Sequence, residues 1–138
     1  MTRLYLLDTN TVSYIIKGVS PSARARLASL SSSEVACISP ITEAELWYGL
    51  ERTRASAQRR KTLESFLGRI RILPWGREEA SVYGSFRAQQ EAIGRPLGPL
   101  DTLIAAHAIA TGAVLVTSDR VFQYAQGLPG IEAWATEF

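Results

Sequence analysis

Short apolar runs alternate with longer stretches of helical periodicity along this sequence. The runs predict buried strands at residues 4–7, 35–38 and 113–117, a short strand at 70–73, and a last short strand near Ile131. Between them the sequence predicts helices at residues 9–17, 23–30, 43–54, 51–66, 78–93, 102–111 and 121–125. This order is that of α/β crossover units, and it predicts a doubly wound α/β fold around a parallel sheet.

Capping residues mark several of the predicted helix ends. Thr9 or Asn10 is expected to cap the helix that stops before Gly18. Thr42 and Glu45 have the spacing of a capping box at the start of the helix predicted for 43–54. The helix predicted for 78–93 is amphipathic, and we expect its two aromatic members in the core. Its core-facing positions recur every three or four residues: Ala80, Tyr83, Phe86, Gln90 and Ile93.

Four carboxylates lie at the ends of predicted elements. Asp8 and Asp119 each follow a buried strand, and Glu45 and Asp101 each lie in the first turn of a helix. Because such positions meet at one edge of a doubly wound sheet, we expect the four side chains to converge. Helix capping is a local alternative for each of them. Glu43 competes with Glu45, and we favour Glu45.

A carboxylate cluster predicts a bound cation, because packed carboxylates repel one another and need a countercharge. Ligation by oxygen alone favours Mg²⁺ or Mn²⁺. The chain has one histidine, His107, and one cysteine, Cys37, which excludes a Cys/His zinc site. We interpret His107 as a helix histidine rather than a general base, and Cys37 as a core residue. A carboxylate-held Mg²⁺ suits phosphodiester hydrolysis, with phosphomonoester hydrolysis as an alternative.

The composition is that of an ordinary globular protein. With 138 residues, 46% of them hydrophobic and 20% charged, we expect one domain over residues 1–138 with a sizeable core. No apolar run approaches the roughly 20 residues that span a bilayer. The amino end lacks the hydrophobic region of a secretory signal, so we expect a cytoplasmic location.

The charge balance points to a polyanionic partner. The net charge is +2, but if four of the thirteen acids hold a metal, the remaining surface is distinctly basic. Thirteen of the fifteen bases are arginine, whose planar fork suits phosphate. The stretch 51–66 is either a solvated face or part of a nucleic-acid surface. Its basic residues are Arg52, Arg54, Arg59, Arg60 and Lys61.

Four motifs surround the four acids. They are LLDTN at residues 6–10, SPITEAELWYG at 39–49, GPLDTLIAA at 98–106, and LVTSD at 115–119 followed by Phe122. In this order and at these intervals they resemble the motifs of the PIN-domain ribonucleases, and among them those of the VapC-type toxins of bacterial toxin–antitoxin modules. The resemblance covers most of the chain and places the second acid at Glu45 rather than Glu43.

The resemblance implies a fold, an activity and partners. The fold is a three-layer α/β/α PIN-like domain with a mainly parallel central sheet. The activity is that of a Mg²⁺-dependent endoribonuclease, with Mn²⁺ as a substitute ion. The resemblance also implies that the metal ligands are Asp8, Glu45, Asp101 and Asp119. The protein would be the toxin of a type II toxin–antitoxin pair. Its partners would be an RNA substrate, a cognate antitoxin that blocks the site, and a second copy of the chain in a homodimer.

Two features depart from the family's pattern. Many relatives carry a polar residue before the third acid, where this chain has Leu100, and the segment between Asp119 and Gly127 is slightly short. Neither departure removes a ligand, but both affect the expected geometry around Asp119. Asp8 and Asp101 are our first choices for direct ligands, and we take Asp119 as an outer member. Two other hypotheses stay open: a non-catalytic module that binds RNA or protein, and a metal-dependent phosphatase or DNA nuclease.

Overall fold

A computed structural model describes residues 1–138 and contains six α-helices, one 3₁₀ helix and five strands. The strands are β1 (Arg3–Leu7), β2 (Glu34–Ile38), β3 (Arg71–Ile72), β4 (Val114–Val116) and β5 (Ile131–Glu132). The helices are α1 (Thr9–Lys17), α2 (Pro21–Ala28), α3 (Pro40–Arg52), α4 (Ala57–Leu67), α5 (Arg77–Ala92), α6 (Pro99–Thr111) and the 3₁₀ helix η1 (Arg120–Tyr124). None of the helices is long and apolar enough to cross a membrane.

The five strands form one sheet in the order β3-β2-β1-β4-β5, and every pair is parallel. Leu6 of the central strand lies opposite Cys37 on one side and Leu115 on the other. The chain leaves β1 toward β2 on one side and later returns to β4 on the other. The strand order therefore reverses at the carboxyl end of β1, which is where parallel α/β sheets bind ligands.

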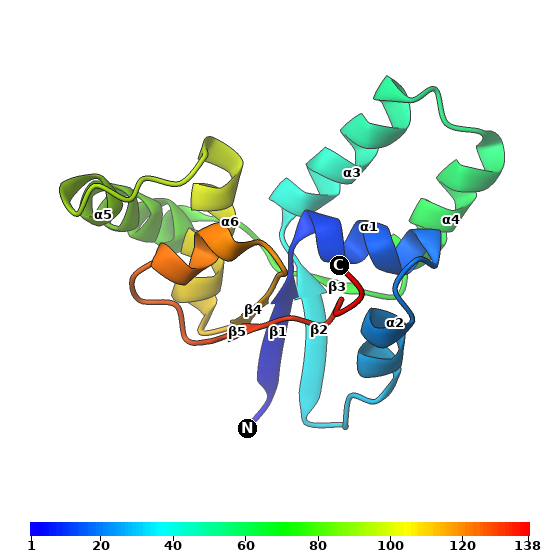
Figure 1. Ribbon diagram of the computed structural model, residues 1–138, viewed down its shortest axis with the longest axis horizontal. Coiled ribbons are helices and arrows are strands. Elements are labelled where there is room, and N and C mark those ends of the chain that lie inside the picture. The colour runs from blue at the N-terminus through cyan, green and yellow to red at the C-terminus, as the bar shows by residue number, and fades with distance from the viewer.

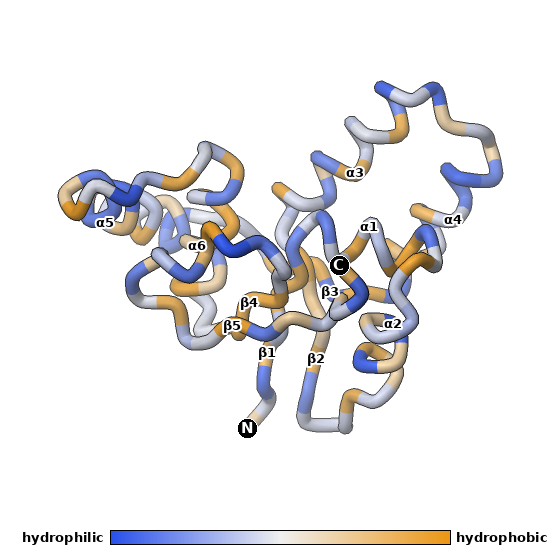
Figure 2. Tube along the Cα trace, in the orientation of Figure 1, coloured by the Kyte–Doolittle hydropathy of each residue, from blue (hydrophilic) through white to orange (hydrophobic).

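Helices cover both faces of this sheet, so the predicted three-layer α/β/α fold is confirmed (Figure 1). On one face, β1 packs through Tyr5 and Leu7 against α1 and α2. On the other face, Leu6 and Leu115 pack against α5 and α6. Alternate residues of β1 thus enter two separate cores, as the period of a strand buried on both faces requires. Hydrophobic positions gather at the sheet, and hydrophilic ones follow the outer part of α3 and α4 (Figure 2).

Some helices have a different cap from the predicted one, and α2, α3 and α6 begin earlier than the sequence predicts. Asp8 itself caps α1, rather than Thr9 or Asn10. Ser39 caps α3 and accepts a hydrogen bond from the Ile41 N–H at 3.1 Å. The capping box that starts at Thr42 is therefore wrong. A proline in the first turn of α3 and of α6 has no N–H to satisfy, which suits an early start.

The stretch 51–66 does not form one helix. The helix α3 ends at Arg52, and Arg54 in the connection adopts a left-handed backbone with φ of 50°. Ser56 then caps α4 by accepting a hydrogen bond from the Arg59 N–H at 3.2 Å. The prediction missed this break because helix-forming residues stand on both sides of it.

The helix α5 buries less of its predicted face than the spacing indicates. Phe86 is buried, but Ala80 and Ile93 are exposed. Gln90 is buried because its side chain joins three backbone groups. Its amide donates to the carbonyls of Arg95 and Tyr124, and its oxygen accepts from the Gln126 N–H, all at 2.9 Å. This glutamine fastens the loop before α6 and the segment after η1 to α5.

Candidate functional site

Asp8 is the buried centre of the candidate site, at the carboxyl end of β1. Its side chain is only 7% exposed. One carboxylate oxygen accepts a hydrogen bond from the Thr11 N–H at 2.8 Å, and the other accepts from the Thr117 hydroxyl at 2.5 Å. Burial raises the pKa of Asp8, the hydrogen bonds oppose that rise, and the charge of Asp119 adds to it. Asp8 is therefore a fixed carboxylate in a position that disfavours an uncompensated negative charge.

Asp119 is tied to Asp8 through Thr117. The Thr117 hydroxyl that donates to Asp8 also accepts a hydrogen bond from the Asp119 N–H at 3.0 Å. The Asp119 side chain in turn accepts from the Val121 N–H at 3.0 Å and caps η1. Thr117 is buried and Asp119 is exposed. The fourth predicted acid thus lies on the solvent side of Asp8, held by a cap of its own.

Glu45 faces the residue that follows Asp8. Its carboxylate accepts a hydrogen bond from the Thr9 hydroxyl at 2.7 Å. Glu43, the competing candidate, accepts instead from the indole N–H of Trp47 at 3.0 Å, within α3. The first turn of α3 therefore directs Glu45 toward the end of β1 and leaves Glu43 in contact with its own helix.

Asp101 lies in the first turn of α6, and its carboxylate accepts no hydrogen bond from the protein. Burial raises its pKa most, and the charges of Asp119, Glu45 and Asp8 raise it further. All three other predicted acids therefore act on Asp101. The structure brings together carboxylates from four separate parts of the chain, at the edge of the sheet where the strand order reverses.

The four carboxylates are near one another but do not yet surround a common point. No group of three or more His, Cys, Asp or Glu side chains is arranged to hold a metal ion. Neighbouring carboxylates repel one another, so bringing these four closer together would require a countercharge. The donor set consists of oxygen only, as Mg²⁺ and Mn²⁺ prefer.

Three threonines hold the site together, and the sequence did not predict this role for them; Thr9 was expected only as a helix cap. Thr9 donates to Glu45, Thr11 gives its backbone N–H to Asp8, and Thr117 bridges Asp8 and Asp119. The only sequence signal for this role is proximity to an acid: Thr9 and Thr11 follow Asp8 by one and three residues, and Thr117 precedes Asp119 by two. Such spacing also fits ordinary capping, so only the tertiary contact between β1 and β4 reveals the role of Thr117.

His107 lies outside this carboxylate cluster. It is fully buried on α6, where its Nε2 atom contacts the Pro74 carbonyl oxygen at 3.1 Å and its ring meets the edge of Trp75. The Nδ1 atom has no hydrogen-bond partner. Burial lowers the pKa of His107, while the Pro74 carbonyl and Glu79 oppose the shift. The interpretation of His107 as a structural helix residue thus fits its surroundings, although one nitrogen is unsatisfied.

We expect His107 to make the fold less stable in mild acid. Its pKa in the folded state lies below the unfolded value of 6.5, so the unfolded chain takes up the proton first as the pH falls. The free energy of unfolding therefore drops as the pH falls through 6.5, until the folded pKa is passed. In His107→Gln, a neutral amide replaces the ring, so the contribution of His107 to the pH dependence of the free energy of unfolding disappears. Urea unfolding of both proteins between pH 7.5 and 5 measures this contribution. A difference in the free energy of unfolding that stays constant over this range would contradict the prediction.

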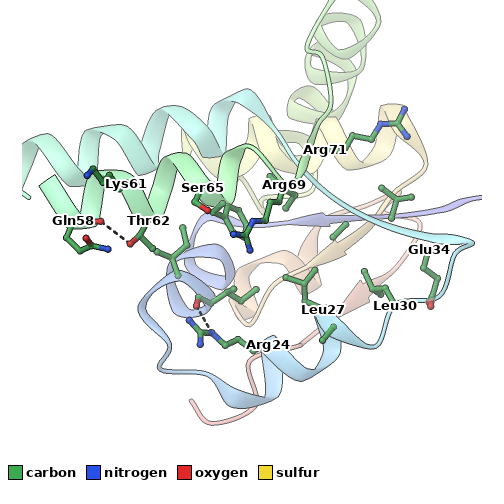
Figure 3. Close-up of a pocket in the computed structure, with 17 residues that line it drawn as sticks. Arg24, Leu27, Leu30, Glu34, Gln58, Lys61, Thr62, Ser65, Arg69 and Arg71 are labelled. Atoms are coloured by element: carbon green, nitrogen blue, oxygen red, sulfur yellow. Dashed lines mark hydrogen bonds between the residues drawn. The ribbon is translucent and has the colours of Figure 1, made fainter. Parts of the chain in front are cut away.

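The surface around α1 and α4 contains two cavities, and only one of them reaches the candidate site. The larger, about 1010 Å³, lies between α1, α2, β2 and α4 and includes none of the four carboxylates (Figure 3). Leu27 and Leu30 lie in this groove, and Arg24, Arg69 and Arg71 also line it. The smaller, about 400 Å³, lies between α1, α3 and α4, and both Glu45 and Thr9 line it. The smaller cleft is therefore the one that adjoins the candidate site.

The chain matches the PIN domain family over residues 5–128. It is 37% identical over 131 residues to the tRNA(fMet)-specific endonuclease VapC of Salmonella typhimurium, covering 94% of this chain and 97% of that protein. It is 36% identical over 116 residues to ribonuclease VapC2 of Rickettsia felis, covering 84% and 87%.

Solved structures agree with the sequence relatives. A crystal structure of VapBC2 from Rickettsia felis, bound to a DNA fragment from their promoter, superposes with a TM-score of 0.88 at 34% identity, covering 95% of this chain and 98% of that one. A DNA-bound VapBC from Salmonella typhimurium gives a TM-score of 0.87 at 36% identity, covering 97% and 99%. The similarity therefore extends over nearly the whole chain.

Proposed function

This chain belongs to the PIN-domain family, among the VapC ribonucleases, and from that membership we propose that it is a Mg²⁺-dependent endoribonuclease, the toxin of a type II toxin–antitoxin pair. The proposal treats residues 1–138 as one cytoplasmic nuclease domain. The observation that carries it is the placement of Asp8, Glu45, Asp101 and Asp119 around the carboxyl end of β1, where the strand order reverses. Burial, and then the charges of the other three acids, raise the pKa of Asp101 there. A divalent cation is the natural countercharge for such a set.

The four carboxylates would hold the metal in graded roles. Asp8 and Asp101 are the proposed direct ligands, because each carboxylate retains free lone pairs after its protein contacts. Asp119 is the outer member, on the exposed side of the site. These carboxylates would hold a Mg²⁺ ion, which would supply positive charge for the phosphoryl oxygens and lower the pKa of a nearby water. Mn²⁺ offers similar coordination and would substitute for it.

The chain's own groups position the reaction. Glu45 either completes the coordination or takes the proton from the attacking water, and the Thr9 hydroxyl sets the orientation of its carboxylate at 2.7 Å. The water oxygen would form a new bond to phosphorus, the P–O bond to one ribose oxygen would break, and that oxygen would leave as a hydroxyl after taking up a proton from solvent. Thr117 and Thr11 hold Asp8 in one orientation before substrate arrives, so little reorganisation is needed.

The substrate and partners follow from the relatives. Because a relative of 37% identity is named for specificity toward tRNA(fMet), we propose tRNA as the substrate class. Because the compared crystals contain VapBC complexes, we propose a cognate antitoxin that blocks the acids. We also propose a homodimer. Light scattering at concentrations well above micromolar would then give twice the mass of one chain, and a monomer mass would contradict that part.

Cleavage of tRNA(fMet) tests the proposal. Purified protein is incubated with tRNA(fMet), with bulk cellular RNA, with single-stranded DNA and with a phosphomonoester, each in Mg²⁺, Mn²⁺ or a chelator. We expect metal-dependent cleavage of RNA at defined sites and none with the chelator. Cleavage of DNA or of the phosphomonoester alone would favour the nuclease or phosphatase alternative. Binding of RNA without cleavage in either metal would favour a non-catalytic module.

A further inference from the structure

The cleft between α1, α3 and α4 carries excess positive charge next to the carboxylate site. Only four of its fourteen lining residues are hydrophobic. Lys17, Arg52 and Arg59 line it, and Glu45 is the single acid among the lining residues. None of the three cations forms a salt bridge. The cleft therefore offers unneutralised positive charge to a ligand that reaches the acids.

One face of α3 leads along the cleft from the acids to the cations. Glu45, Gly49 and Arg52 are four and then three residues apart, so they share a helix face. The stripe is about 10 Å long at 1.5 Å per residue, the length of roughly three stacked nucleotides at about 3.4 Å per phosphate. Its negative end lies at the candidate metal site and its positive end lies at the far end of the cleft.

Gly49, in the middle of that stripe, leaves the wall open. No heavy atom lies within 4 Å of the position that its Cβ would take. Glycine inside a helix is destabilising relative to alanine, because the unfolded chain gains more freedom. A backbone left bare at this point widens the cleft and lets a ligand approach α3 closely.

The facing side of α1 is polar as well. Asn10, Ser13 and Lys17 are three and then four residues apart and line the same cleft. Asn10 and Lys17 are exposed, and Ser13 is half-buried. Amide, hydroxyl and ammonium groups in this order suit the phosphates and sugars of a nucleic-acid backbone, which such side chains contact without reading sequence.

Arg59 is directed into the cleft by the turn that separates α3 from α4. Its guanidinium donates to the Thr53 hydroxyl oxygen at 3.4 Å, and that hydroxyl donates to the Gly49 carbonyl at 2.8 Å. The neighbouring Arg60 instead pairs with Glu51 on the exposed surface. Within the basic stretch, Arg60 is thus paired on the exposed surface, whereas Arg52 and Arg59 form no salt bridge and line the cleft.

We propose that this cleft binds the RNA backbone on one side of the scissile bond, with Lys17, Arg52 and Arg59 on its phosphates. The inference rests on the proposed function and adds the path of the substrate to it. An RNA strand fits better than a peptide, because the walls are polar and continuous with Glu45. The 1010 Å³ groove, where nine of seventeen lining residues are hydrophobic, suits a protein partner better.

Binding of tRNA(fMet) by cleavage-deficient Asp8→Asn protein tests the proposal. Adding Arg52→Gln and Arg59→Gln should weaken binding by about tenfold or more and reduce the slope of log K against log salt by about 1.4, at about 0.7 per lost phosphate contact. Adding Arg3→Gln and Arg77→Gln removes the same charge outside the cleft. That control should change neither value, and equal losses in the two variants would overturn the proposal.

Two further variants separate charge and shape from folding. Arg52→Lys with Arg59→Lys keeps both charges, so most of the affinity and of the salt slope should remain. Gly49→Leu adds no charge but fills open space in the cleft, and it should raise the Kd for tRNA(fMet) while the protein stays folded by circular dichroism. Unchanged RNA affinity in Gly49→Leu would count against the cleft.

The remaining outcomes distinguish this proposal from the proposed function. RNA binding with the predicted salt slope, but no cleavage by the unmutated chain, would support the cleft and contradict the nuclease. Metal-dependent cleavage, with an unchanged KM in Arg52→Gln/Arg59→Gln, would support the nuclease and overturn the cleft. A third outcome is that Arg52→Gln/Arg59→Gln keeps its KM for RNA but is no longer inhibited by a co-expressed antitoxin. The cleft would then bind a protein, and the proposal would be overturned.

Discussion

Asp8→Asn is expected to lower the rate of tRNA(fMet) cleavage at least about 100-fold, the loss that follows removal of one preorganised electrostatic group from an active site. Asparagine keeps the volume of Asp8 and an oxygen that caps the Thr11 N–H, so the fold should persist. What it removes is the negative charge that would bind the metal. Single-turnover cleavage in saturating Mg²⁺ measures the effect.

Matched variants make this result interpretable. Glu43→Gln changes a carboxylate of the same region whose contact is with Trp47, so cleavage should stay within about twofold of the unmutated rate. Asp8→Ala also loses the cap of α1, so its free energy of unfolding should fall by about 1 kcal/mol. Cleavage by Asp8→Asn at the unmutated rate would remove Asp8 from the proposed metal site.

Thr117→Val is expected to reduce cleavage by about 10–100-fold, the usual effect of losing a group that orients a metal ligand. Valine matches the shape of threonine but lacks the hydroxyl that donates to Asp8 and accepts from the Asp119 N–H. Asp8 would then lose one of its two fixed contacts. The Mg²⁺ concentration that gives half of the maximal rate should rise, and titration of the cleavage rate with Mg²⁺ measures it.

Serine at position 117 is the control for this role. Thr117→Ser keeps the hydroxyl and removes only a methyl group, so the half-saturating Mg²⁺ concentration should stay near that of the unmutated chain. Thr117→Val should also lower the free energy of unfolding by about 1–3 kcal/mol, because a buried hydrogen bond to a charged group is lost. If Thr117→Val and Thr117→Ser raise the half-saturating Mg²⁺ concentration equally, the effect comes from packing rather than from the hydroxyl.

The central strands were predictable because β1 and β4 are short apolar runs buried in the sheet, whereas the edge strands β3 and β5 are short and largely exposed. Leu6 and Leu115 lie opposite each other in the sheet, as the doubly wound pattern requires. The helix starts were less predictable, since serine, threonine and aspartate all cap helices. Local spacing favours Thr42 as the cap of α3, but Ser39 takes that position next to Pro40, which suits the first turn.

The approach of the four acids was predictable from topology, while the groups that hold them were not. Asp8 and Asp119 each follow a strand of one parallel sheet, so their proximity depends only on strand order. The bridge through Thr117 depends on the register between β1 and β4, and the basic cleft depends on the turn that redirects Arg59. Neither distance along the sequence nor composition contains that information.

Calorimetric titration with Mn²⁺ tests the central claim most directly, namely that carboxylates from four parts of the chain form a binding site for a divalent cation. The unmutated protein should bind Mn²⁺ with a clear heat signal, and Asp8→Asn and Asp101→Asn should each weaken that binding by about tenfold or more. Glu43→Gln should bind as the unmutated chain does. Absence of Mn²⁺ binding, or equal binding by all four proteins, would contradict the claim.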